Sequence, residues 1–235
     1  MVLNEVSMGS SMLKNAPVRR VLFHGLILLV LSLVLIVSLF PPLESMDYVF
    51  YLLTSTLKVA PESLLMIIDL LLLLAGYWLA GSLYLLLSTG RLFSNFLLET
   101  WTRISRINRI FNRRGLVSLV LVGGIIVFWH LPMFMDAALL SYELHLVMHA
   151  STLFAGVLVF VGFRTLSPNQ RLLTYLLGCK GMAIFGAYLC VAPIVVYGSY
   201  PFYEQAQAGA AMVAMCVASD ATIIPIWLRR YFSKE

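Results

Sequence analysis

The chain has 235 residues, of which 61% are hydrophobic and only 11% are charged, and its formal net charge is +5. A soluble domain carries roughly 25% charged residues, so this composition excludes a separate water-soluble domain and predicts an integral membrane protein. The excess of Lys and Arg then reports the orientation of the chain in the membrane, and we expect no nucleic-acid partner.

The first half of the chain predicts two membrane-spanning helices. Residues 21–40 contain no Asp, Glu, Lys or Arg, and about 20 apolar residues are enough to cross the hydrocarbon core of a bilayer. Residues 41–62 are typical of an outer loop with aromatic side chains at the membrane interface, and residues 63–87 are the second predicted span. Six arginines follow in residues 91–114, spaced so that a helix would have one basic and one apolar face. We expect this segment to lie on the cytoplasmic surface of the membrane.

The second half of the chain predicts four more spans, and the charges of the loops give their orientation. These spans are residues 115–135, 137–163, 172–197 and 205–228. With the N-terminus inside, every Lys and Arg of the loops and termini except Lys58 lies on the inner side, in agreement with the positive-inside rule. The sequence therefore predicts one all-α domain, a polytopic bundle of about six transmembrane helices in the plasma membrane, with both termini cytoplasmic.

Three of the four histidines are predicted to converge in the outer half of this bundle. His130 comes shortly before the outer end of the third span, and His145 and His149 lie two to three turns into the fourth. A separation of four residues puts His145 and His149 on one helix face, one turn apart. The short link makes the third and fourth helices antiparallel neighbours. Because imidazole is the commonest protein ligand for metals, we expect these three side chains to form a metal site.

Copper is the favoured ion for such a site. Met133 and Met148 fall in the same region as additional ligand candidates, and imidazole with thioether suits copper, especially Cu(I). Two imidazoles from facing helices can instead hold the iron of haem b as axial ligands. A structural role, with hydrogen bonds between helices and no cofactor, is the third alternative. The sequence contains no HExxH, GxSxG or Walker motif, so we do not predict a hydrolytic enzyme.

Charged side chains inside the predicted spans form a second group of candidates. Lys180 lies near the middle of the fifth span, Asp220 in the inner half of the sixth, and Asp69 in the outer part of the second. A charge at the centre of the bilayer costs roughly 2.5–3.5 kcal/mol on insertion scales, so each should have a partner. We expect Lys180 and Asp220 to be a buried pair that joins two helices, with a proton relay as the alternative.

Polar residues also mark the outer start of the sixth span, at the predicted depth of the histidines. They are Glu204, Gln205 and Gln207. A buried amide is costly unless it is hydrogen-bonded. We therefore expect these side chains to orient a ligating histidine or to act as further ligands, with capping of the helix as the alternative.

Three motifs together resemble the CtaG-type cytochrome c oxidase assembly proteins and related short archaeal membrane proteins of unknown function. They are Trp129-His130-x-Pro132, His145-x-x-x-His149 and Glu204-Gln205-x-x-Ala208-Gly209-x-x-Met212. The resemblance covers residues 115–229 and departs from the family pattern at Glu204, where Asp is usual, and at Val213, where Trp is usual. It implies a non-enzymatic membrane factor for the maturation of haem-copper oxidases, with the three histidines as copper ligands. The implied partners are respiratory oxidase subunits or copper carriers.

Overall fold

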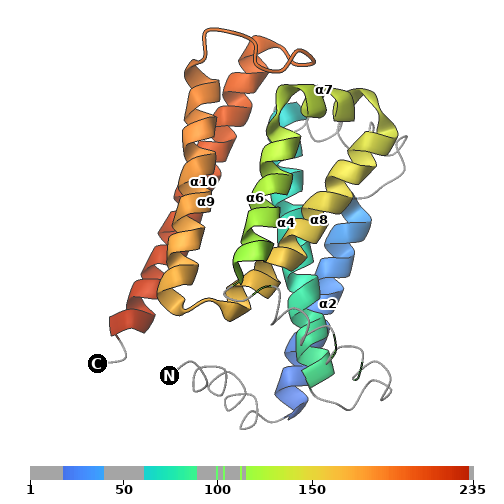
Figure 1. Ribbon diagram of the computed structural model, residues 1–235, viewed down its shortest axis with the longest axis vertical. Coiled ribbons are helices and arrows are strands. Elements are labelled where there is room, and N and C mark those ends of the chain that lie inside the picture. The colour runs from blue at the N-terminus through green and yellow to red at the C-terminus, as the bar shows by residue number, and fades with distance from the viewer. Residues whose placement is uncertain are drawn as a thin grey trace.

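All regular secondary structure in the described part of the chain is α-helical, as predicted (Figure 1). The computed structural model describes residues 18–39, 61–88, 99, 103, 112 and 115–232. The helices are α2 (Val18–Leu39), α4 (Pro61–Ser88), α6 (Leu116–His130), α7 (Pro132–Leu140), α8 (Tyr142–Thr165), α9 (Pro168–Val191) and α10 (Phe202–Phe232). The predicted loop at 41–62 and most of the predicted amphipathic segment at 91–114 lie outside the described residues.

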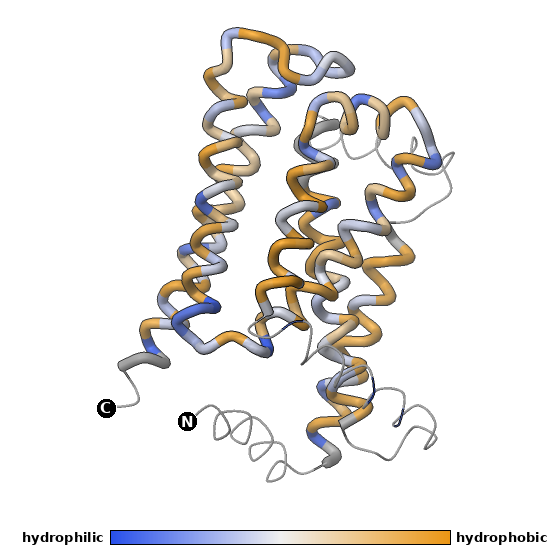
Figure 2. Tube along the Cα trace, in the orientation of Figure 1, coloured by the Kyte–Doolittle hydropathy of each residue, from blue (hydrophilic) through white to orange (hydrophobic). Residues whose placement is uncertain are grey.

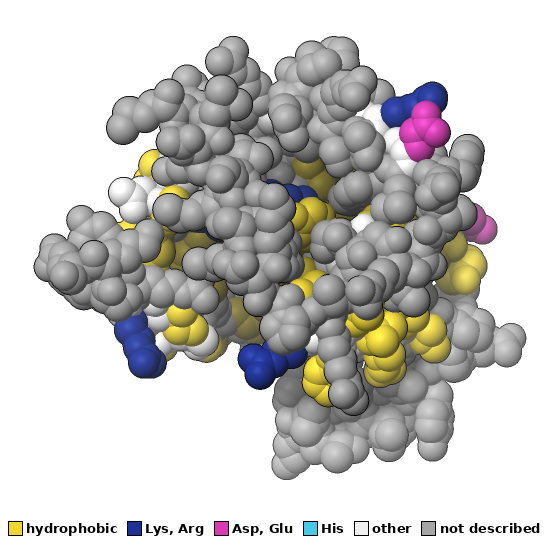
Figure 3. All heavy atoms as spheres, turned by 90° about the horizontal axis from the view of Figure 1, so that it is seen from below, with side chains coloured by type: hydrophobic (Ala, Val, Ile, Leu, Met, Phe, Trp, Pro, Cys, Tyr) yellow, Lys and Arg dark blue, Asp and Glu magenta, His cyan; other side chains and the backbone are white. Residues whose placement is uncertain are grey.

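The number of candidate membrane spans agrees with the predicted polytopic bundle. Among the described residues, five helices are long and apolar enough to cross a membrane, and α6 with α7 gives a sixth when this bent pair is taken as one span. Apolar residues extend along the helices (Figure 2). The start of α2 and the end of α10 lie at the same end of the bundle (Figure 1), as an even number of spans requires. We call this the inner end, because Lys and Arg side chains are visible on it (Figure 3).

A sharp break at Leu131 divides the third predicted span. Leu131 is extended, with φ −70° and ψ 131°, as a residue before proline prefers, and Pro132 then occupies the first turn of α7. The two helices are bent by 69° relative to each other, and α7 lies across the outer end of the bundle (Figure 1). The helix of the third span therefore ends at His130 instead of continuing to 135, and the helix of the fourth span begins at Tyr142.

The limits of α9 also differ from those predicted for the fifth span, 172–197. A capping box between Ser167 and Gln170 starts the helix before the predicted boundary, because it satisfies backbone N–H groups of the first turn. The helix ends at Val191 since Pro193 follows, and proline cannot continue the hydrogen-bond ladder of a helix. The residues that follow form the outer loop to α10.

Glycines set the distance between α4 and α8, which pack against each other and both run from the outer to the inner end (Figure 1). A Cβ atom added at Gly76 would lie 1.9 Å from the carbonyl oxygen of Leu153, and one added at Gly156 would lie 2.0 Å from that of Leu73. Only glycine permits two helix backbones to approach this closely. A second glycine pair similarly joins α9 to α10.

A buried core near the outer end joins the α9–α10 hairpin to the other helices. Met135 of α7, Met148 of α8 and Met212 of α10 are almost completely buried in it. At its edge, the indole Nε1 of Trp129 donates a 2.6 Å hydrogen bond to the hydroxyl of Ser151, which ties α6 to α8. This core fixes the outer ends of the helices that carry the predicted histidines.

Candidate functional site

Two histidines and one aspartate come together between α4 and α8 in the outer half of the bundle. The rings of His145 and His149 lie with their centroids 4.4 Å apart and their planes at 77°. The Oδ1 atom of Asp69 lies 3.4 Å from Nδ1 of His149. The His149 side chain is 3% exposed and that of Asp69 15%, so the protein itself shields these two side chains from lipid and water. The helical spacing predicted the contact between the two histidines, whereas Asp69 was predicted only to have some partner.

The glycine contact explains why Asp69 reaches the histidines. Asp69 precedes Gly76 by seven residues, and His149 precedes Gly156 by seven residues. Seven residues are about two helical turns, so each side chain lies on the same helix face as its glycine. Because α4 and α8 are parallel, the two side chains meet two turns above the glycine contact. Once the structure shows that Gly76 and Gly156 mark the crossing, this matched spacing groups Asp69 with the histidines.

Polar atoms in this group have capacity for a ligand. Within the described structure, Oδ1 of Asp69 and Nε2 of His145 are buried and have no hydrogen-bond partner. Buried polar atoms are nearly always satisfied, because an unpaired one costs free energy. Carboxylate oxygen and imidazole nitrogen are both ligands of first-row metal ions. In the described ranges, however, no three His, Cys, Asp or Glu side chains are already grouped closely enough to hold a metal ion.

The third predicted ligand, His130, has different surroundings. Its Nδ1 lies 2.7 Å from the carbonyl oxygen of Ile126, one turn earlier in α6, and its ring packs edge-on against Phe185 of α9 at 5.9 Å. The structure therefore brings His145 and His149 together and does not place His130 in one metal-binding group with them. Its Nε2 atom is nevertheless buried without a hydrogen-bond partner among the described residues.

Comparison with known proteins now gives the family. Residues 16–233 match the model of the cytochrome c oxidase caa3 assembly factor family, Caa3_CtaG. The chain belongs to this family. The match confirms the resemblance seen in the three motifs and extends it to the first two spans. No curated protein and no solved structure matches the chain significantly.

In this Caa3_CtaG family member the surroundings of the two methionine candidates differ from those of the paired imidazoles. The side chain of Met133 is on the surface of α7, with 69% of its area exposed, whereas Met148 is fully buried in the apolar core. The described structure thus gives the histidine pair a carboxylate neighbour, and it assigns the buried methionine to packing.

The polar residues at the start of α10 hold the outer loop of this family member. Gln205 is buried, and its Oε1 accepts hydrogen bonds from the backbone N–H groups of Val196, at 2.7 Å, and Tyr197, at 3.2 Å. Glu204 accepts a 2.8 Å hydrogen bond from its neighbour Tyr203, and Gln207 is exposed. The observed role of Gln205 is therefore to fix the loop that follows α9.

Two further contacts attach this loop to α6 and α7. The carboxylate of Asp136 accepts hydrogen bonds from the backbone N–H groups of Gly198, at 3.1 Å, and Ser199, at 3.0 Å. The hydroxyl of Tyr197 donates a 3.0 Å hydrogen bond to the carbonyl oxygen of His130. Burial, together with the charge of Asp136, raises the pKa of Tyr197 above its usual range, so the hydroxyl stays protonated and remains a donor. The backbone at His130 is thus held by the outer loop.

Lys180 of α9 and Asp220 of α10 form an ion pair between the two helices. Asp220 also accepts a 3.0 Å hydrogen bond from the hydroxyl of Tyr175. The Lys180 side chain is 52% exposed, compared with 17% for Asp220, so the pair lies at the surface of the hairpin and is not enclosed by the protein. In a bilayer such a pair is favoured because each charge avoids facing lipid alone.

Removing one member of this pair should destabilise the protein more than removing both. We expect Lys180→Met to lower the melting temperature by on the order of a few degrees, because Asp220 keeps a charge without its partner. The double variant Lys180→Met/Asp220→Leu should recover most of this loss. Thermal unfolding of the purified protein in detergent measures both. Equal melting temperatures for the single and double variants would contradict a stabilising role for the pairing.

Proposed function

We propose that this protein is a non-enzymatic factor in the biogenesis of a respiratory haem-copper oxidase and holds copper in the outer half of its membrane bundle. His145 and His149 are the proposed ligands, with Asp69 as the third. The family match supports the role in oxidase assembly. The observation that supports the copper site is the contact of two imidazoles and a carboxylate. The ring centroids of His145 and His149 are 4.4 Å apart, and Oδ1 of Asp69 lies 3.4 Å from Nδ1 of His149.

The donor set fits copper in a different way from the one the sequence predicted. Two nitrogen donors and one oxygen donor suit Cu(II), whereas the thioether of methionine would favour Cu(I). His130 lies outside this set in the structure: its Nδ1 is held by the carbonyl oxygen of Ile126, and its Nε2 is buried without a hydrogen-bond partner among the described residues. We therefore propose His145 and His149 as the essential pair and His130 as a ligand that is recruited during transfer. Copper is cargo in this scheme, and oxidase subunits or copper carriers at the plasma membrane are the proposed donors and acceptors.

Metal analysis of the purified protein tests this proposal. We expect about one equivalent of copper after loading and desalting, and none in the variant His145→Ala/His149→Ala. The matched control is His24→Ala, because His24 lies in α2 near the inner end, where its Nδ1 lies 2.7 Å from the carbonyl oxygen of Arg20 and its ring packs against Phe23. This control should keep the wild-type stoichiometry. Absence of copper from the wild type, or full retention by the double variant, would overturn the copper site.

An absorption spectrum of the same sample separates copper from the haem alternative. A b-type haem with axial histidines gives a strong Soret band, and copper held by imidazole and carboxylate does not. We expect no Soret band. Its presence, and its loss in His145→Ala/His149→Ala, would replace the copper proposal by haem binding.

A further inference from the structure

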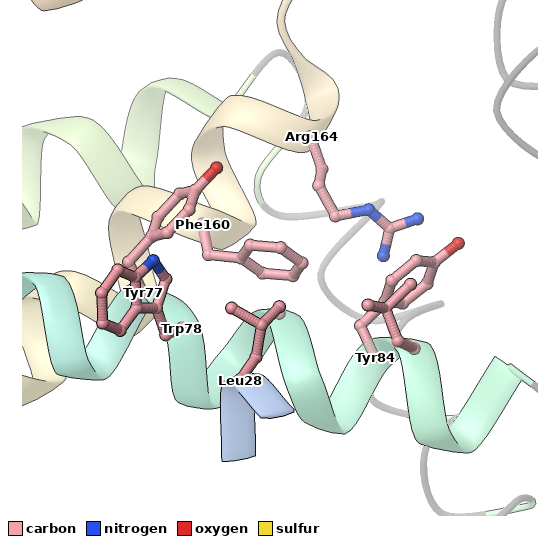
Figure 4. Close-up of a pocket in the computed structure, with 8 residues that line it drawn as sticks. Leu28, Tyr77, Trp78, Tyr84, Phe160 and Arg164 are labelled. Carbon is pink, nitrogen blue, oxygen red and sulfur yellow. The ribbon is translucent and has the colours of Figure 1, made fainter. Parts of the chain in front are cut away.

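A pocket of about 350 Å³ opens between α2, α4 and α8 (Figure 4). Along α8 its lining residues follow the histidine pair, so the pocket lies on the inner side of that pair. Its lining is apolar and aromatic apart from one cation: Leu28, Tyr77, Trp78, Tyr84, Phe160 and Arg164. We propose that this pocket binds an anionic phospholipid of the inner leaflet, with an acyl chain between the aromatic side chains and the phosphate paired with Arg164. The inference is independent of copper binding.

The walls of the pocket give room for a hydrocarbon chain. Phe160 of α8 packs edge-on against Tyr77, with centroids 5.5 Å apart, and lies 6.1 Å from Tyr84. The two tyrosines are seven residues apart in α4, so the wall extends about 10 Å along the helix axis. Gly81 lies between them and adds no side chain to this wall; an added Cβ atom would lie 3.4 Å from the Phe160 ring, in van der Waals contact.

The cation lies at one end of this wall. The guanidinium carbon of Arg164 lies 3.5 Å from the centre of the Tyr84 ring and 5.9 Å from that of Phe160, and Figure 4 shows it at the end of the pocket away from Trp78. Stacking on an aromatic ring leaves the N–H groups at the edge of a guanidinium available to bind oxygen atoms. No carboxylate among the described residues forms an ion pair with Arg164.

The depth of Arg164 matches that of a lipid phosphate. Arg164 is in the last turn of α8, at the inner end of the span Tyr142–Thr165. A pocket that runs from this level toward the middle of the bilayer places a phosphate at its polar end and a chain at its apolar end. The basic residue and the anionic lipids of the inner leaflet are complementary in charge. A soluble anion would satisfy Arg164 and leave the aromatic wall uncovered, so the lipid is the better occupant.

Native mass spectrometry of the full chain in detergent tests the proposal directly. The probes are phosphatidylglycerol and phosphatidylcholine with identical acyl chains. One basic side chain near the surface should give the wild type a preference for phosphatidylglycerol of roughly fivefold. Arg164→Gln should remove this preference, and Arg229→Gln, which removes an exposed charge at the inner end of α10 outside the pocket, should keep it. Equal binding of the two lipids by the wild type, or an unchanged preference in Arg164→Gln, would overturn the proposal.

A second variant tests the hydrocarbon part of the site without touching the charge. Gly81→Leu places a side chain between Tyr77 and Tyr84, so it should weaken the binding of both lipids by at least threefold and leave their ratio at the wild-type value. Binding of either lipid at wild-type strength would show that the acyl chain does not lie in the pocket, and would overturn the proposal. Elution as a single species at the wild-type volume establishes that each variant is folded.

Discussion

Gly156→Ala should lower the free energy of unfolding by about 3 kcal/mol, the upper part of the usual range for overpacking a close contact. An added Cβ atom would lie 2.0 Å from the carbonyl oxygen of Leu73 and 2.9 Å from the backbone nitrogen of Tyr77. Both are backbone atoms of α4, so no side-chain rotation relieves the clash, and α4 and α8 must move apart. Gly76→Ala should have a similar effect, because its Cβ atom would meet the backbone of Leu153 at 1.9 Å.

The same substitution should also weaken the metal site, although it lies two turns away from it. The contact between Asp69 and His149 spans α4 and α8, and the glycines hold these helices together. A separation of even 1 Å at the crossing changes the 3.4 Å distance between Oδ1 and Nδ1. We therefore expect Gly156→Ala to lose both thermal stability and copper.

Gly178→Ala and Gly123→Ala are suitable controls for this experiment. Both glycines lie within helices, and an added Cβ atom at either position would meet no atom within 4 Å in the described structure. Neither change should lower the melting temperature or the copper content. If Gly156→Ala has the same melting temperature as these controls, the close contact of α4 and α8 does not contribute to stability.

The sequence was sufficient to predict features that depend on one segment at a time. The membrane class follows from composition, and the approximate positions of the spans follow from apolar runs, so that α2, α4 and α10 begin and end within four residues of the predicted limits. The contact of His145 with His149 follows from a separation of four residues in one helix. Pro132 marks a possible break in the third span, yet a proline near the end of a span does not specify whether the helix ends there or continues in a new direction.

Features that depend on the register between two helices could not be predicted in this way. Whether Asp69 meets His149 depends on where α4 crosses α8, and no periodicity within either helix specifies that crossing. His130 was predicted to converge with the other two histidines, and in the structure its Nδ1 is bound by the carbonyl oxygen of Ile126 in its own helix. Side-chain rotamers of this kind follow from local hydrogen bonds and packing, which cannot be predicted from the spacing of residues along a helix.

Asp69→Asn should lower the affinity for copper by at least about 10-fold to 100-fold, because that is already the usual cost of removing a carboxylate that only supports a metal-ligating histidine, and Asp69 is the proposed third ligand. The change keeps the shape of the side chain and removes its negative charge, so the packing of α4 against α8 is preserved. The remaining amide oxygen is a weaker donor for a metal ion and a weaker partner for the His149 ring, which lies 3.4 Å from the carboxylate. Competition with a chelator of known affinity measures the loss.

Glu143→Gln is the matched control for Asp69→Asn, because it removes the same charge at the same end of the bundle. Glu143 is exposed in the first turn of α8, and its carboxylate accepts a 2.9 Å hydrogen bond from the hydroxyl of Ser141. If copper is attracted only by negative charge at the outer surface, both variants should weaken binding equally. If Asp69 belongs to the copper site, the control should bind copper like the wild type, and only Asp69→Asn should show the loss. Equal affinities for all three proteins would remove Asp69 from the site and leave the two imidazoles alone as the copper ligands between α4 and α8.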